Sequence, residues 1–403
     1  MTKPDEIFYY WNRQKTHKPI ALNDETLRDG LQATYIRGLN LDQKKLFLDL
    51  LPQVHIHSVN IGFPSSGPEQ ARHVLELAKY IKNHKLDLDA DIGARSIVSD
   101  IDPALDIIDK VGQPLEIGIF IGSSHIRQIV EKWELKAMGQ LVRVAVTHAT
   151  KNGAKVMFIT EDTTRAYPQT IKYLYQTAID SGASRICVSD TVGCATPEST
   201  TKLLKYIFQD IVGHQPVLVD WHGHNDRGLA VANSLAAARA GVDRIQATAL
   251  GIGERAGNTS MEQLIINLYL EHLLKVGEIK FLYDYTRFAA KHLKVRIKPN
   301  DPIAGSHIFF TATGVHAAAI KKAYDMNRPD LAGLVYSAID PSLIGRKPDI
   351  KVGPMSGKSN AMWILQKIKR PANDRNITLI LNEAKNQNRI LKPKEIKHLL
   401  GKK

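Results

Sequence analysis

Two histidines, His222 and His224, are separated by a single residue and directly follow an apolar run of the sequence. On a strand, residues i and i+2 point to the same face, so both imidazoles can reach one point at the end of that strand. Neutral imidazole is a common ligand of divalent transition metals. The pair therefore predicts part of a metal site, whose remaining ligands must come from other segments.

A carboxylate and a guanidinium, Asp29 and Arg28, are adjacent near the start of the sequence, in a segment that Gly30 closes. Asp29 and the two histidines would form a site with one oxygen and two nitrogen ligands, which leaves coordination positions free for substrate and water. The alternative is that Arg28 and Asp29 form only an ion pair. We favour the metal site because it also accounts for the histidines.

A glycine-rich segment, Gly251–Asn258, supplies further candidate residues. Its glycines permit a tight backbone whose N–H groups suit an anion. Asn258 offers a neutral carbonyl oxygen that would join or steady the metal shell, and Glu254 is a catalytic candidate. The alternative is a turn that caps the helix expected to start near Thr259.

These candidates follow short β-branched runs that alternate with longer amphipathic stretches between residues 20 and 275. Eight strand-then-helix units over about 250 residues are typical of a (β/α)8 TIM barrel, in which the loops after the strands meet at one rim. The competing fold is an open doubly wound sheet, but no Gly-x-Gly-x-x-Gly follows the first run. Each candidate is expected just after a strand. The expected strands are Ile20–Asn23, Ser58–Gly62, Leu86–Ile92, Leu115–Ile121, Lys155–Thr160, Arg185–Ser189, Val217–Trp221 and Arg244–Thr248.

The pattern changes after about residue 276, where a turn-rich segment, Lys298–Pro302, precedes further helical patterns. Helices are expected there at His316–Asp325, Asn360–Ile368 and Ile377–Asn386. The sequence thus predicts an α/β fold, a TIM barrel followed by a mostly helical C-terminal region. Its expected parts are an N-terminal extension (residues 1–19), a catalytic barrel (residues 20–290) and helical subdomains (residues 291–403).

The composition argues against several classes of protein. The apolar fraction of 43% and the charged fraction of 24% are ordinary for a globular protein. No apolar run approaches the ~20 residues that span a bilayer, and Met1–Glu6 lacks the layout of a secretory signal. Two cysteines, Cys187 and Cys194, argue against a disulfide scaffold and favour a reducing compartment, so we expect a cytoplasmic protein.

The net charge of +13 is concentrated near the end of the sequence, where residues 361–403 carry 11 Lys or Arg and 3 Asp or Glu, hence +8. A basic tail of this kind is either a nucleic-acid-binding segment or a solvated helical face. No aromatic-interleaved basic patch or zinc-finger spacing supports the first, so nucleic acid is not an expected partner. A basic surface would also suit an anionic substrate that carries phosphates.

Three ordered segments, Asp24–Gly30, His222–Asp226 and Gly251–Asn258, resemble those of the DRE-TIM metallolyase superfamily. More narrowly, they are similar to its Claisen-condensing branch, which contains 2-isopropylmalate, homocitrate and citramalate synthases. The likeness extends past the barrel and covers roughly residues 20 to 360. The later matching segments are Ala312–His316, Tyr336–Pro341 with Gly345 and Arg346, and Ser356–Lys358.

The resemblance implies a role for most of the candidates. A divalent ion, which could be magnesium, manganese, zinc or cobalt, would be held by Asp29, His222, His224 and Asn258. Arg28 would lie at the keto oxygen of a 2-oxo acid as a substrate-binding and catalytic group. Thr191 would hydrogen-bond the substrate carboxylate, and Glu161 would contribute to the same pocket.

The reaction that the resemblance implies is a Claisen-type condensation of acetyl-CoA with a 2-oxo acid. The first candidate substrate is 2-oxoisovalerate, which would give 2-isopropylmalate and CoA in leucine biosynthesis. His316 and Tyr336 would act as acid–base groups, reaching in from the partner subunit of a domain-swapped homodimer. The helical subdomains would thus complete the active site of the partner.

The sequence departs from the family pattern in two places. Leu31 stands where the usual Asp-Gly-Glu-Gln has glutamate, which counts against a homocitrate synthase and resembles lyases and aldolases of the wider superfamily. Fewer than 50 residues follow Ser356, so the regulatory C-terminal domain of the synthases is not expected. The alternatives are a hydroxymethylglutaryl-CoA lyase-like enzyme, a homocitrate or citramalate synthase and, from another class, a nucleic-acid-binding protein on an inactive barrel.

Overall fold

The computed structural model describes residues 18–274 and 279–401, so almost all of the expected N-terminal extension lies outside the described residues. The chain divides into two compact units. The first comprises Met1–Gly277 and Asp284–Arg296, and the second comprises Glu278–Tyr283 and Ile297–Lys403. Within the described ranges, no helix has both the length and the apolar character needed to cross a membrane.

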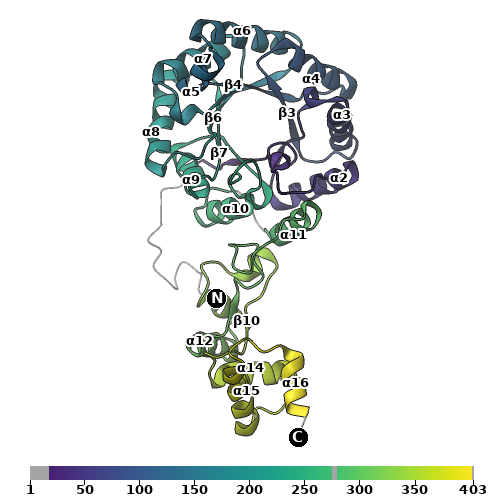
Figure 1. Cartoon of the computed structure of the whole chain (residues 1–403), viewed down its shortest axis with the longest axis vertical. Helices are drawn as coiled ribbons and strands as arrows, with labels where there is room; N and C mark the ends of the chain where they lie inside the picture. Colours follow the sequence, from purple (N-terminus) through teal and green to yellow (C-terminus); the bar gives the residue numbers. More distant parts are fainter. Residues whose placement is uncertain (1–17, 275–278, 402–403) are drawn as a thin grey trace. The chain divides into compact units, whose positions relative to one another are not determined.

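The first unit is a closed barrel of eight parallel strands, which confirms the predicted (β/α)8 fold. Each strand pairs with the next one along the chain, and β8 closes the barrel on β1 with Ala21 opposite Arg244. Figure 1 shows these strands at the centre of a ring of helices. The strands are β1 (Ala21–Asp24), β2 (Ser58–Asn60), β3 (Asp89–Arg95), β4 (Glu116–Gly122), β5 (Lys155–Glu161), β6 (Arg185–Asp190), β7 (Leu218–Gly223) and β8 (Arg244–Ala247).

Several strands extend further toward the rim than the sequence predicts. Glu161 ends β5, Asp190 ends β6, and His222 lies within β7, so the prediction that these residues follow their strands is wrong. The cause is backbone pairing, since Glu161 lies opposite Gly122 and Asp190 opposite Gly223 in the ladders. A polar side chain at the end of a strand does not interrupt a parallel ladder, because the hydrogen bonds are made by the backbone.

The helices of this unit turn an apolar face toward the barrel. In α3, buried residues recur three or four positions apart at Val74, Leu77 and Ile81, and Pro68 occupies the first turn, where no backbone N–H is needed. Gly241 caps the C-terminus of α9 with a φ of 99°. The helices are α2 (Leu41–Leu50), α3 (Pro68–Asn83), α4 (Val98–Val111), α5 (His125–Glu131), α6 (Leu135–Lys151), α7 (Pro168–Asp180), α8 (Pro197–Ile207), α9 (Ala230–Ala240), α10 (Met261–Leu270) and α11 (Leu282–Leu293).

The interior of the barrel contains a network of paired charged side chains at positions that apolar side chains usually occupy. Arg244 donates to Asp220 at 2.7 Å, to Glu116 at 2.6 Å and to the Ser58 hydroxyl at 2.7 Å. Arg185 donates to Glu116 at 3.0 Å and to Asp220 at 2.7 Å. Buried charges are tolerated when they are paired and hydrogen-bonded, as they are here.

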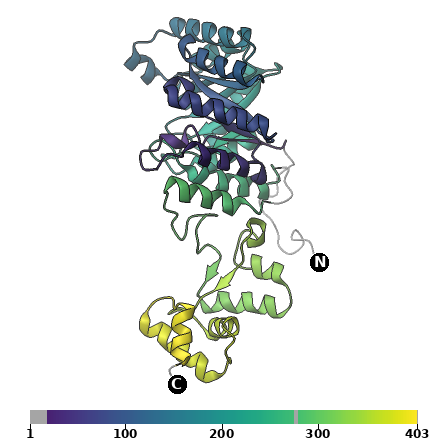
Figure 2. The ribbon, with the colours of Figure 1, turned by 90° about the vertical axis from the view of Figure 1, so that its right-hand side faces the viewer.

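The second unit contains a two-stranded parallel sheet and five helices among its described residues. The helices predicted near residues 316, 360 and 377 are present. One apolar cluster lies between α14, α15 and α16, the yellow helices of Figure 2, and includes Ile364, Ile380 and Ile396. The elements are β9 (Phe310–Thr311), α12 (Gly314–Asp325), α13 (Pro329–Leu334), β10 (Asp349–Ile350), α14 (Lys358–Lys367), α15 (Asp374–Gln387) and α16 (Pro393–Gly401).

Candidate active site

Asp29, His222 and His224 converge at the rim formed by the carboxyl ends of the strands. The Nε2 atom of His222 lies 3.4 Å from Oδ2 of Asp29, and Nε2 of His224 lies 3.6 Å from the same oxygen. All three residues are buried, and one ligand atom from each lies within 4.8 Å of the others. Ligands about 2.1 Å from one tetrahedral ion lie about 3.4 Å apart, so this spacing suits a single cation.

The electrostatic surroundings keep Asp29 ionised. Burial works to raise the pKa of Asp29, but the charge of Arg28 and the neighbouring imidazoles of His222 and His224 outweigh it and hold the pKa well below its usual range. The ion pair considered for Arg28 and Asp29 is present, with Nη1 of Arg28 3.5 Å from Oδ2 of Asp29. Because this contact is longer than a hydrogen bond, it leaves the carboxylate able to bind a cation.

Asn258 lies beside these groups and forms a backbone bridge with His224. Its Nδ2 atom donates to Oδ1 of Asp29 at 3.2 Å and to the carbonyl oxygen of Ile252 at 3.0 Å. Its Oδ1 atom is buried without a hydrogen-bond partner among the described residues. An oxygen buried in this way costs free energy unless something binds it. The donor set and the unpartnered oxygen together fit a divalent cation.

The glycine-rich segment brings Asn258 to this position by close backbone approach. Gly253 has a φ of +150°, and a Cβ atom there would lie 2.1 Å from Nδ2 of Asn258. Gly257 has a φ of +87°, and a Cβ atom there would lie 1.9 Å from the carbonyl oxygen of Gly251. Only glycine can occupy such positions without moving the backbone. The turn expected from the sequence is therefore also what positions Asn258.

A cavity of about 450 Å3 opens at the rim of the barrel. The sequence-predicted residues that line it are Asp29, His222, His224, Arg28, Glu161, Thr191 and Glu254. Sequence reasoning missed Arg127 and Arg165, which also line it, because nothing in their local patterns separates them from surface arginines. The cavity residues named here, with Asp29 and the two histidines, lie in or just after β1, β4, β5, β6, β7 and β8, with Arg127 in the first turn of α5.

Thr191 and Glu161 occupy one part of this cavity. The Oγ1 atom of Thr191 accepts a hydrogen bond from the backbone N–H of Asp162 at 2.8 Å, which leaves the hydroxyl hydrogen free to donate. Burial raises the pKa of Glu161, and the nearby charge of Arg127 opposes that rise. The cavity thus offers a hydroxyl donor and a carboxyl group with an elevated pKa.

Arg28 is held by a residue that the sequence interpretation did not single out. The Oε2 atom of Glu25 accepts from Nε of Arg28 at 2.9 Å and lies 2.7 Å from its Nη2. Burial works to lower the pKa of Arg28, but Glu25 and Asp29 outweigh it and raise that pKa. The sequence signal that could have indicated this ion pair is the position of Glu25, an acidic residue three positions before Arg28.

The two candidates of the second unit, His316 and Tyr336, lie against each other. Their rings are stacked with centroids 3.8 Å apart and an angle of 27° between the ring planes. His316 lies in the first turn of α12, and Tyr336 follows α13 with 48% of its surface exposed. The structure therefore brings together an imidazole and a phenol that are accessible to another molecule.

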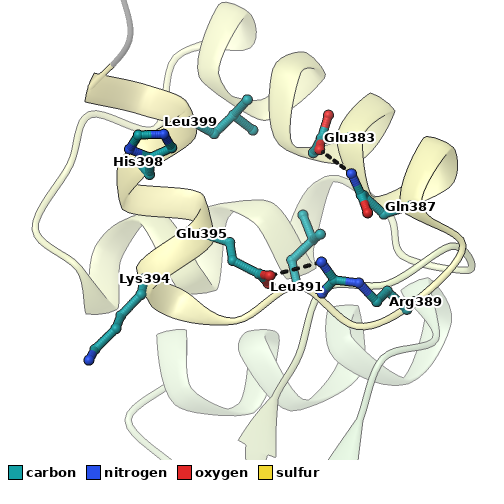
Figure 3. Close-up of a pocket in the computed structure, with 8 residues that line it drawn as sticks. All are labelled: Glu383, Gln387, Arg389, Leu391, Lys394, Glu395, His398 and Leu399. Atoms are coloured by element: carbon teal, nitrogen blue, oxygen red, sulfur yellow. Dashed lines mark hydrogen bonds and ion pairs between the residues drawn. The ribbon is translucent and has the colours of Figure 1, made fainter.

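A second cavity, of about 380 Å3, lies between α15 and α16 (Figure 3). Its polar groups largely satisfy one another, since Arg389 pairs with Glu395 at 2.8 Å and Gln387 donates to Glu383 at 3.0 Å. Within the part of the chain that the structure describes, Asp29, His222 and His224 are the group of three placed to hold a metal ion. The cavity at the barrel rim is therefore the candidate active site.

Residues 19–290 match the family described as HMGL-like. The chain belongs to the HMGL-like family. This match spans the barrel and all of its candidate residues, and it confirms the superfamily that the sequence motifs indicate. Figure 1 shows the barrel portion of this match as the ring of helices around the strands.

Curated relatives of this HMGL-like chain extend the match into the second unit. It is 32% identical to the "Probable 2-isopropylmalate synthase" of Ignicoccus hospitalis, over 91% of this chain and 87% of that protein. It is 31% identical to "Homocitrate synthase AksA" of Methanothermobacter thermautotrophicus, over 84% of this chain and 81% of that protein. It spans only 66% and 63% of the 2-isopropylmalate synthases of Pyrococcus furiosus and Lactococcus lactis.

Among solved structures, the HMG-CoA lyase of Bacillus subtilis matches with a TM-score of 0.61 and 16% identity. The match covers 72% of this chain and 98% of the lyase. At this level of identity the likeness supports the shared barrel fold and leaves the reaction to be argued from the site.

Proposed function

We propose that this HMGL-like enzyme is an acyltransferase that condenses acetyl-CoA with a 2-oxo acid in a metal-dependent Claisen-type reaction. The first candidate substrate is 2-oxoisovalerate, which gives 2-isopropylmalate and CoA. The observation that carries the proposal is the convergence of Asp29, His222 and His224 beside Arg28 in one cavity. The names of the curated relatives support the choice of reaction.

The reaction forms a carbon–carbon bond between the acetyl methyl group and the ketone. A divalent cation held by the three ligands would polarise a chelating 2-oxo acid. Arg28 places a fixed positive charge where negative charge develops on the keto oxygen. Thr191 donates its free hydroxyl hydrogen to the substrate carboxylate and so orients the ketone. Glu161 contributes to the same pocket, where burial raises its pKa.

Two proton transfers accompany bond formation. A base removes a proton from the acetyl methyl group, the new carbanion attacks the keto carbon, and the resulting alkoxide takes up a proton. We assign the base and its relay to His316 and Tyr336, supplied by the partner subunit of a homodimer, and we keep Glu254 as a further catalytic candidate. Hydrolysis of the thioester then releases CoA and makes the overall reaction irreversible.

A specific observation favours a second class of 2-oxo acid. Arg127 lines the cavity, and its Nε atom is buried without a hydrogen-bond partner among the described residues. A guanidinium with a free donor suits a substrate that carries a second carboxylate, as in a homocitrate synthase. Phe120 and Ile159 line the same cavity and favour an apolar side chain. Substrate choice therefore depends on which of these groups faces the side chain of the 2-oxo acid.

The proposal is tested by the release of free thiol from acetyl-CoA with a panel of 2-oxo acids and a divalent ion. The panel should contain 2-oxoisovalerate, pyruvate and 2-oxoglutarate, and the His222→Ala protein provides the background rate. Release that requires both the 2-oxo acid and the ion supports the condensation. Cleavage of hydroxymethylglutaryl-CoA without any condensation would identify the lyase alternative instead. The cytoplasmic location stays a prediction.

A further inference from the structure

We infer that Glu25 is a positioning residue that fixes the direction of the Arg28 guanidinium, and that a hydrogen-bonded column inside the barrel holds Glu25 in place. The inference rests on the proposed function, since it concerns how Arg28 meets the keto oxygen. Glu25 itself is 1% exposed and is not among the residues that line the cavity. Its effect on the reaction must therefore pass through Arg28.

The contacts between the two side chains define the orientation of Arg28. The Oε2 atom of Glu25 accepts from Nε at 2.9 Å and lies 2.7 Å from Nη2. These contacts occupy one edge of the guanidinium and leave Nη1 on the side of Asp29, 3.5 Å from its Oδ2 atom. Because the guanidinium is planar and rigid, fixing one edge fixes the direction of the remaining donors.

Glu25 also has partners on its other oxygen. Its Oε1 atom accepts from Nδ2 of Asn23 at 3.0 Å and from Nδ2 of Asn60 at 3.4 Å. These residues lie in β1 and β2, which are paired strands of the barrel. Both oxygens of the carboxylate are thus satisfied, one by Arg28 and the other by side chains that stand on rigid strands.

The column continues from Asn23 through the interior of the barrel. The Ser58 hydroxyl donates to Oδ1 of Asn23 at 2.7 Å, and Nη1 of Arg244 donates to the same hydroxyl oxygen at 2.7 Å. Arg244 in turn donates to Asp220 at 2.7 Å. Every residue of this hydrogen-bonded column is buried. A satisfied buried network of this kind is rigid, so it holds Glu25 with little freedom.

Without the charge of Glu25, the ion pair that Arg28 keeps among the described residues is the one with Asp29. Arg28 would then turn toward Asp29, whose Oδ2 atom it already approaches, and would form a direct hydrogen bond with it. That movement would take the donors away from the keto oxygen and would place Arg28 in competition with a cation for Asp29. Glu25→Gln should therefore slow the condensation and weaken binding of the 2-oxo acid.

A double-mutant cycle separates this role from a general loss of stability. In the wild-type background, Glu25→Gln should lower kcat/KM for the 2-oxo acid by ~100-fold, the size of effect seen when an electrostatic donor is lost. In an Arg28→Lys background the same change should cost less than ~3-fold, because the guanidinium that it positions is gone. Glu25→Asp, which keeps the charge, should lie between the wild type and Glu25→Gln.

The matched control is Glu271→Gln, which breaks a glutamate–arginine pair with Arg239 on the outside of the barrel. It should leave kcat/KM unchanged. Equal losses from Glu25→Gln in both backgrounds would overturn the inference. A wild-type enzyme that condenses no 2-oxo acid would overturn the proposed function instead. In that case the role of Glu25 is decided by calorimetry of 2-oxo acid binding in the presence of magnesium. The four proteins are the wild type, Glu25→Gln, Arg28→Lys and the double variant, and a smaller effect of Glu25→Gln in the Arg28→Lys background again supports the positioning role.

Discussion

The Nε2 atom of His222 lies 3.4 Å from Oδ2 of Asp29, although the two residues come from opposite ends of the barrel sequence. The contact exists because the carboxyl ends of β1 and β7 lie at the same rim of a closed parallel barrel. Two imidazoles beside a carboxylate of depressed pKa form a buried set of one oxygen and two nitrogen donors. A divalent cation is the partner that such a site binds best.

His222→Ala should therefore lower metal retention and abolish turnover. Changes outside the ligand shell already cost ~10- to 100-fold in metal affinity, so loss of a ligand should cost more than ~100-fold. The measurement is metal content per chain after dialysis against a weak chelator, followed by the thiol-release assay. His148→Ala is the control, because it removes a histidine that contacts Asp102 at 2.7 Å outside the barrel. A His222→Ala protein with normal rates at trace metal would contradict the assignment.

Thr191→Val should raise KM for the 2-oxo acid by ~10-fold with a smaller change in kcat. Valine keeps the shape of threonine but can neither accept the hydrogen bond from Asp162 N–H nor donate to a substrate carboxylate. KM for acetyl-CoA should not change, because the hydroxyl is assigned to the other substrate. Thr191→Ser restores the hydroxyl and should restore KM. Equal KM values in the Val and Ser proteins would remove Thr191 from the substrate site.

His316→Ala should retain binding of the 2-oxo acid and lose condensation by ~100- to 10,000-fold, the range for loss of a general base. Calorimetry measures the first property and thiol release the second. His307→Ala is a matched control in the same unit, since its ring lies 5.3 Å from that of Phe310 and is not assigned to catalysis. Parallel losses of binding and rate in His316→Ala would indicate a structural role for the stacked pair.

The barrel and most of its site could be predicted because both depend on repeating patterns. Eight alternating units specify the closed sheet, and the rim then gathers the residues that end each strand. Glu25 was not predictable, because its role depends on hydrogen bonds that Asn23 and Asn60 donate to it from two paired strands. The predicted strand ends at Glu161 and His222 are wrong, because a polar side chain resembles the start of a loop while the backbone ladder still includes both residues.

Gly257→Ala should disorganise the glycine-rich segment and release Asn258 from Asp29. An added Cβ would lie 1.9 Å from the carbonyl oxygen of Gly251, and the φ of +87° is strained for alanine. We expect a loss of ~1–3 kcal/mol or more in unfolding free energy together with weaker metal retention. Gly241→Ala is the control, because its φ is also positive but no atom lies within 4 Å of the added Cβ. Its cost should be ~1 kcal/mol, with metal retention unchanged.

Asp91→Asn should stabilise the protein, increasingly so as pH rises. Asp91 lies in β3, is 1% exposed, and neither of its carboxylate oxygens has a hydrogen-bond partner among the described residues. Burial raises its pKa well above the ordinary value of 3.8, and the charge of Glu25 adds to that rise. The folded protein therefore keeps a proton that the unfolded chain loses as pH rises above 3.8.

The sign of the effect follows from which state binds the proton. Because the folded state binds more protons, the free energy of unfolding of the wild-type protein falls as pH rises from 3.8 to the raised pKa of Asp91. An asparagine does not titrate, so the variant does not lose this stability. The gain in Tm for Asp91→Asn should grow as pH rises above about 4, at ~2–4 °C for each kcal/mol. Asp42→Asn, in the first turn of α2, is the control for the same change on the surface. A gain that is constant with pH, or a loss at every pH, would mean that Asp91 is ionised and paired inside the barrel.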